Sequence, residues 1–184
     1  LSSYSGIDLT DFFSYYVFDT ITHHFAIESL TFSENSAKVK IFSTTENNYN
    51  QPCSNTRIPI TFMDSAFNRY KTMIIDNGTR EEHNFSLPFT PIAAFLDFDE
   101  EFFDLTTDSY KFISEPGNYE FKNSYFKANV TSCQDTILIR PTLHWIGADN
   151  TQSIEGINRF SQKHYWTIEG INLENADIEV KFYF

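Results

Sequence analysis

The histidines are the first residues to consider, because an imidazole can act as a general acid or base and as a metal ligand. They stand at His23, His24, His83, His144 and His164, and no two of them have the spacing of a His-Glu-x-x-His zinc helix. His23 and His24 can supply half of a metal site, but neighbouring residues of a strand point to opposite faces. We therefore expect one buried and one exposed imidazole, and we predict no metal-binding residue.

Motifs for a nucleophile or a cofactor are absent from the sequence. It contains no Gly-x-Ser-x-Gly turn, no glycine-rich phosphate loop and no Cys-x-x-Cys pair. We predict no catalytic residue, no cofactor-binding residue and no cofactor in this chain, and hence that the chain itself is not an enzyme.

The acidic run Asp97–Asp104 has two interpretations. Several carboxylates in one loop suit a hard cation such as calcium. However, the run lacks the glycine that allows an EF-hand loop to turn, and its aromatic residues alternate as those of a strand do. A solvated, acidic strand end is the favoured interpretation.

Aromatic residues are unusually abundant, with 20 Phe, 10 Tyr and 2 Trp. Trp145, Tyr165, Trp166 and the many other Tyr residues can form a stacking platform for sugars, although most rings in so aromatic a chain are expected to fill a core. Aromatic residues also favour pleated, half-buried surfaces, which indicates a β protein.

Charge and cysteine content narrow the class of protein further. The formal net charge of −12 argues against a nucleic-acid partner, and no apolar run reaches the ~20 residues of a membrane-spanning helix.

Cys53 and Cys133 allow one disulfide, which would close a loop of about 80 residues; the sequence does not decide whether it forms. Because the chain starts at Leu1 without a charged-then-apolar leader, we expect a mature product or a fragment.

One segment has a helical period. Leu9, Phe12, Phe13, Tyr16 and Val17 recur at i, i+3, i+4, i+7 and i+8, and Asp8 can cap the first turn. This predicts a short helix with one aromatic face, which must dock on another surface because so short a helix is marginal alone.

After His24 the period changes to two. Strands are expected at 25–32, 37–44, 58–62, 70–75, 85–89, 92–98, 124–131, 137–145, 165–168 and 178–184, with turn signals such as Asp76-Asn77-Gly78 and Glu115-Pro116-Gly117-Asn118 between them. We predict a mainly β fold: a short N-terminal helix in residues 1–22, an antiparallel immunoglobulin-like β-sandwich in 23–105 and a second, smaller β unit in 106–184. One continuous sandwich is the alternative, since no linker marks the boundary.

Several segments carry a resemblance to one family. Ser5–Phe13 resembles the helix that ends the catalytic domain of zinc metallopeptidases of the aminopeptidase-N and leukotriene-hydrolase type. His24–Ile27 resembles the first strand of their β-sandwich domain, and Arg57–Ile60 another strand of that domain. Leu138–Asp149 and His164–Ile171 are similar to segments of secreted bacterial members with added C-terminal β domains. Thr20-Ile21-Thr22-His23 departs from the Gly-x-Pro that usually precedes the first strand, and Ala148 replaces an expected proline.

The resemblance implies a non-catalytic accessory region. The family's zinc-binding motif would lie before Leu1, so zinc is expected in a catalytic domain of the same polypeptide, and the second β unit is expected to be shortened. The chain would pack on that catalytic domain and limit access to the substrate cavity, in a secreted, periplasmic or cell-surface protein.

Two other functions stay open at this point. An extracellular, aromatic-rich module that binds carbohydrate or protein would present solvent-facing Tyr or Trp on one sheet. A purely structural surface or adhesion domain would have neither a groove nor a ligand.

Overall fold

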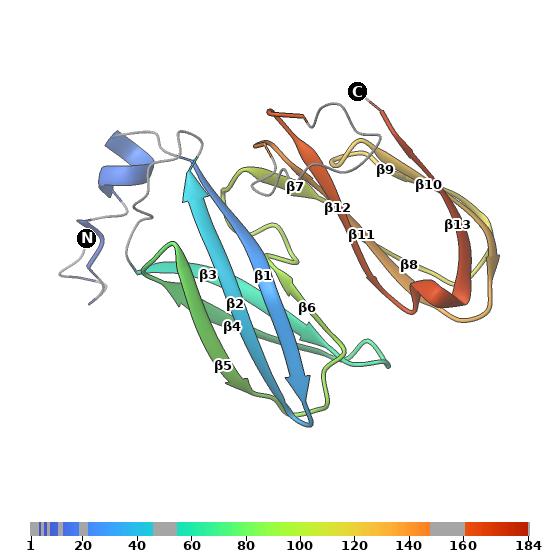
Figure 1. Cartoon of the computed structure of the whole chain (residues 1–184), viewed down its shortest axis with the longest axis horizontal. Coiled ribbons are helices and arrows are strands. Elements are labelled where there is room, and N and C mark those ends of the chain that lie inside the picture. The colour runs from blue at the N-terminus through green and yellow to red at the C-terminus, as the bar shows by residue number, and fades with distance from the viewer. Residues whose placement is uncertain are drawn as a thin grey trace, which may run out of the picture. The chain divides into compact units, whose positions relative to one another are not determined.

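The computed structural model describes residues 22–45, 55–147 and 161–183, together with 4, 6, 8–10 and 13–18 near the N-terminus. In these residues the chain is mainly β, and its paired strands run antiparallel. The predicted mainly β, antiparallel character is therefore confirmed. The chain divides into two compact units, Leu1–Leu105 and Thr106–Phe184 (Figure 1).

The first unit contains two three-stranded sheets (Figure 1). One has the order β1-β2-β5, formed by β1 (His23–Ser33), β2 (Ser36–Thr45) and β5 (Arg80–Ser86). The other has the order β4-β3-β6, formed by β3 (Thr56–Met63), β4 (Arg69–Asp76) and β6 (Ala93–Leu96). The alternating pattern of β2 buries Ala37, Val39 and Ile41, which meet Ile58, Ile60 and Phe62 of β3 in a sandwich-like core.

The second unit pairs a three-stranded sheet with a four-stranded one. The first has the order β13-β10-β9, formed by β9 (Gly117–Phe121), β10 (Phe126–Cys133) and β13 (Ala176–Phe182). In the other, β11 (Ile137–His144) pairs with β12 (Tyr165–Ile171) on one side and with the short strands β7 (Thr106–Asp108) and β8 (Lys111–Ile113) on the other. A 3-10 turn, η2 (Leu173–Asn175), joins β12 to β13.

The core of the second unit lies between its two sheets. Phe126, Ala128 and Val130 of β10 pack with Ile137 and Ile139 of β11, and all five are buried. Because side chains alternate along a strand, Lys127 and Asn129 must point to the outer face of the β10 sheet. β11 differs, since every one of its residues is buried, including Arg140, Thr142 and His144.

The short N-terminal helix predicted from the sequence is not shown by the described residues. The described residues form one π-helical segment, η1 (Phe13–Phe18), and the Phe13 N–H donates to the Leu9 carbonyl oxygen at 3.0 Å. Phe12 lies outside the described residues, so the α-helix with an aromatic face that the spacing indicated is not shown.

The sequence analysis missed β7, β8 and β9, and the strand that it expected at 85–89 overlaps only the end of β5 (Arg80–Ser86). The first two are only three residues long, and Thr106-Thr107-Asp108 has no apolar alternation to detect. β9 begins at Gly117, inside the predicted turn 115–118, so that turn signal marks only the approach to the strand.

Whether Cys53 and Cys133 form a disulfide stays untested, because Cys53 lies outside the described residues. The Cys133 thiol donates to the Asp135 carbonyl oxygen at 2.8 Å. Within the part of the chain that the structure describes, no helix has the length and apolar character to cross a bilayer.

Candidate functional site

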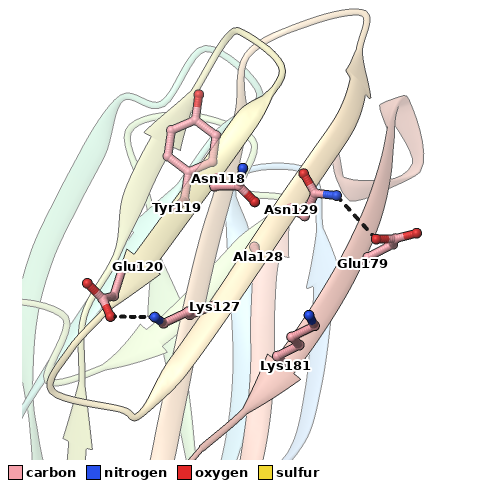
Figure 2. A pocket seen from close by; sticks show the side chains of 8 residues that line it. All are labelled: Asn118, Tyr119, Glu120, Lys127, Ala128, Asn129, Glu179 and Lys181. Carbon is pink, nitrogen blue, oxygen red and sulfur yellow. Dashed lines mark hydrogen bonds and ion pairs between the residues drawn. The ribbon is translucent and has the colours of Figure 1, made fainter.

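A hollow of about 380 Å³ lies on the outer face of the β9–β10–β13 sheet (Figure 2). Polar side chains from all three strands surround it, and its lining comprises Asn118, Tyr119, Glu120, Lys127, Ala128, Asn129, Glu179 and Lys181. These polar residues alternate with core residues along each strand, so the same period that builds the core also builds this face.

The strand register arranges the polar side chains in two rows across the sheet. Glu120 lies opposite Lys127, which lies opposite Lys181 on the far strand. In the neighbouring row Asn118 lies opposite Asn129, which lies opposite Glu179. Residues directly opposite each other are close enough to interact, and each row contains one such contact, Glu120 with Lys127 in the first and Asn129 with Glu179 in the second.

The first row holds an ion pair and an additional cation. The Lys127 ammonium lies 2.9 Å from a Glu120 carboxylate oxygen. This hydrogen bond lowers the pKa of Glu120, helped by one from the Tyr183 hydroxyl at 3.1 Å, and it raises the pKa of Lys127. Both groups therefore stay charged around neutral pH. Lys181 stands opposite the like charge of Lys127, and in the described residues its ammonium has no ion pair.

The second row supplies neutral amides and one carboxylate. The Asn129 amide donates to a Glu179 carboxylate oxygen at 3.2 Å (Figure 2). The hollow thus presents ammonium, carboxylate and amide groups side by side, a set suited to hydrogen bonding a polar molecule.

A group of aromatic rings adjoins the first row. The Lys127 ammonium lies 4.9 Å from the centroid of the Tyr183 ring. Tyr183 makes an edge-to-face contact with Tyr125 at 6.0 Å, and Tyr125 makes another with Trp145 at 6.3 Å. The exposed fraction is 38% for Tyr125 and 44% for Trp145, so both rings are accessible to a ligand.

Sequence reasoning did not single out this face. Lys127, Asn129, Glu179 and Lys181 can be read as outward residues from the alternation of their strands. Their assembly into rows depends on which strands pair and in what register, and β9 had not been recognised.

His23 and His24 are both buried, so the expectation that one imidazole is exposed was wrong. Burial lowers the pKa of each histidine from 6.5 to about 4. Alternation distinguishes the two faces of a strand, but it does not reveal that both faces are covered at this end of β1.

Carboxylates of the acidic run form hydrogen bonds and ion pairs with other groups of the protein. The Asp97 carboxylate accepts hydrogen bonds from the backbone N–H groups of Glu101 and Phe102, both at 2.8 Å. The Lys71 ammonium lies 3.2 Å from Asp99 and 2.6 Å from Glu101. These contacts give the carboxylates a role in closing a turn and pairing with a neighbouring strand, which favours the interpretation without calcium.

Trp145, Tyr165 and Trp166 do not form one platform. Tyr165 stacks on His144 with ring centroids 4.2 Å apart, whereas the Trp166 ring packs against Phe182 at 4.9 Å. Tyr165 and Trp166 are adjacent in β12, so they point to opposite faces of the sheet.

A buried charge cluster on β11 was also missed. The Arg140 guanidinium donates to the buried Asp108 carboxylate of β7 and, at 3.1 Å, to Glu169 of β12. The single Arg inside the apolar run Ile137–Leu143 is the sequence signal that could have indicated it, since a buried charge needs a partner.

Among the described residues, no group of three or more His, Cys, Asp and Glu is arranged to hold a metal ion. Comparisons with known protein families, with curated proteins and with solved structures found no match.

Proposed function

We propose that this chain is a non-catalytic β region of a metallopeptidase of the aminopeptidase-N type, secreted, periplasmic or at the cell surface. In this proposal the first unit is an immunoglobulin-like sandwich, and residues 1–22 belong to the end of the catalytic domain. The chain packs on that domain and limits which substrates reach its cavity.

The order of elements supports the proposal. His24–Ile27, which resembles the first strand of the family's sandwich domain, lies in β1 and begins the first sheet. Arg57–Ile60, which resembles another strand of that domain, lies in β3 of the facing sheet.

The observation that carries the proposal is the exposure of apolar side chains just before β1. The exposed fraction is 75% for Phe18 and 50% for Val17, and Tyr4 is almost fully exposed. Fully burying a side chain such as Val or Phe stabilises by roughly 1.5–3 kcal/mol. A catalytic domain that covers this segment would supply that burial.

The upstream coding sequence is the first test. The proposal requires a His-Glu-x-x-His motif followed by a further Glu ahead of Leu1. If the upstream region encodes only an anchor or a carbohydrate-active domain, the proposal is wrong.

The docking itself is tested by mixing the separately expressed upstream domain with this chain. Phe18→Asp should abolish co-elution of the two, whereas Phe103→Asp should not, because Phe103 is equally exposed, at 74%, but lies after β6. Equal behaviour of the two variants would contradict docking through the N-terminal segment.

The accessory role predicts a change of selectivity. The complete parent protein should prefer short aminoacyl-p-nitroanilides to long peptides more strongly than a parent that ends at residue 22. The isolated chain should hydrolyse neither substrate. Chelator-sensitive hydrolysis by the isolated chain would refute the non-catalytic role.

A further inference from the structure

We propose that the second unit binds a neutral carbohydrate chain on the outer face of the β9–β10–β13 sheet and on the adjoining rings of Tyr183, Tyr125 and Trp145. Such binding does not depend on whether the chain accompanies a catalytic domain.

The balance of charge on this face favours a neutral ligand. Lys127 and Lys181 are matched by Glu120 and Glu179, so the hollow has no formal net charge although the whole chain carries −12. A polyanion would meet the two carboxylates, and a polycation would meet the two ammonium groups. Sugar hydroxyls both donate and accept hydrogen bonds, so they can use all four charged groups.

The pairing within the rows leaves hydrogen-bonding capacity for a ligand. In the first row Glu120 and Lys127 pair with each other, and in the second Asn129 pairs with Glu179. Lys181 and Asn118 stand at opposite ends of the two rows, and neither side chain has a hydrogen bond within the described part of the second unit. Both remain able to donate to a molecule lying in the hollow.

The aromatic rings extend the polar face into one continuous surface. The Tyr183 hydroxyl donates to Glu120, and the Tyr183 N–H donates to the Tyr125 carbonyl oxygen at 3.0 Å. The Trp145 indole N–H donates to the Thr107 hydroxyl at 3.1 Å, which fixes this half-exposed ring before any ligand binds. Rings held in place in this way lose little conformational entropy on binding.

The geometry of the rings determines how a sugar chain can contact them. The Tyr125 ring plane is tilted by 88° from that of Trp145 and by 69° from that of Tyr183. Each ring therefore offers a separate apolar surface to the C–H groups of one sugar unit, while the polar rows bind hydroxyls. The combination of apolar rings with a few directed polar groups is typical of ligand sites.

The test is affinity electrophoresis of the whole chain in native gels that contain laminarin, xylan, galactomannan or polygalacturonate. The variants are Lys127→Ala and Trp145→Ala. Lys38→Ala is the control for charge, because Lys38 forms a cross-strand ion pair with Glu82 at the same 2.9 Å and with similar exposure in the first unit. Tyr70→Ala is the control for an exposed ring.

At least one of the three neutral polysaccharides should retard the unmodified chain. Lys127→Ala and Trp145→Ala should weaken this retention roughly tenfold, equivalent to about 1.4 kcal/mol, and the two controls should leave it unchanged. If Trp145→Ala has a lowered melting temperature, Asn129→Ala decides in its place, because Asn129 is the outward-facing middle residue of the second row and packs in neither core.

Three results would overturn the proposal. The first is a lack of retardation by every neutral polysaccharide, which would leave this face to a protein partner. The second is retardation by polygalacturonate alone, which would indicate an anion site. The third is retardation that the site variants and the controls weaken equally.

Discussion

His23 and His24 are neighbours in β1, and both imidazoles are fully buried although they point to opposite faces of the strand. Burial disfavours the charged form, so the pKa of each falls from 6.5 to about 4. The pair therefore stays neutral in the folded chain across the range in which free histidine becomes protonated.

The stability of the first unit should fall on mild acidification. Below about pH 6.5 the unfolded chain binds protons that the folded chain does not, so the free energy of unfolding decreases until about pH 4. With 1.36 kcal/mol for each pKa unit, each histidine contributes at most about 3 kcal/mol to this loss. Urea midpoints measured across this range should show the decrease.

Substitution identifies the groups responsible. His24→Leu should reduce the loss of stability between about pH 7 and pH 4. His164→Leu, which alters a histidine outside β1, should retain most of it. A loss of stability that is the same in His24→Leu as in the unmodified chain would exclude His24 as its cause.

The charge cluster of the second unit should be costly to break. Arg140→Ala leaves the buried Asp108 carboxylate without its cation, and such a loss typically costs about 3–5 kcal/mol. Arg80→Ala, which breaks an exposed pair with Glu28, should cost at most about 1 kcal/mol. The measurement is the free energy of unfolding of each variant. Equal losses in the two variants would show that burial does not determine how much an ion pair contributes to stability.

Alternation was sufficient to predict most of the longer strands, although β5 runs from Arg80 to Ser86 and only touches the strand expected at 85–89. Ile58, Ile60 and Phe62 revealed β3, and Phe126, Ala128 and Val130 reveal why β10 buries one face only. The short strands β7 and β8 were not predictable, because they form by pairing with β11 rather than by any pattern of their own.

The candidate site could not be predicted from one strand alone, because its rows depend on which strands pair and in what register. The identity of Lys127 indicates a polar outward residue, but its neighbours Glu120 and Lys181 lie on other strands. Register is set by the whole sheet, so cross-strand rows appear only once the pairing is known. The same limit applies to Arg140, whose partners come from β7 and β12.

Gly170 of β12 should tolerate no side chain. A methyl group there would overlap the Leu138 carbonyl oxygen and would lie 2.8 Å from a methyl carbon of Leu173. Gly170→Ala should therefore destabilise the second unit by roughly 1–3 kcal/mol. Thermal or urea denaturation provides the measurement.

Gly78→Ala is the matched control for this substitution. Its new methyl group would meet only the flexible end of the Glu81 side chain, at 3.3 Å, which can move away. Its effect should stay within about 0.5 kcal/mol. Comparable losses in the two variants would mean that close backbone approach does not explain the glycine at position 170.

The Ser43 hydroxyl donates to the buried Asp76 carboxylate at 2.6 Å, and this bond should stabilise the first unit mainly while that carboxyl is ionised. Burial raises the pKa of Asp76, whereas the Ser43 hydrogen bond opposes that rise by favouring the ionised form. Ser43→Ala should cost roughly 1–3 kcal/mol at a pH above the pKa of Asp76, since it removes a hydroxyl donor from the ionised, buried carboxylate.

The cost of Ser43→Ala should shrink as the pH falls through the raised pKa of Asp76, because the protonated carboxyl no longer needs that donor. Ser36→Ala is the control, since Ser36 also lies in β2 and donates at 2.6 Å, but from an exposed position to the Ser33 carbonyl oxygen. Urea denaturation of both variants at neutral and acidic pH should separate them. A cost for Ser43→Ala that does not change with pH would mean that the hydroxyl does not act on the charge of Asp76.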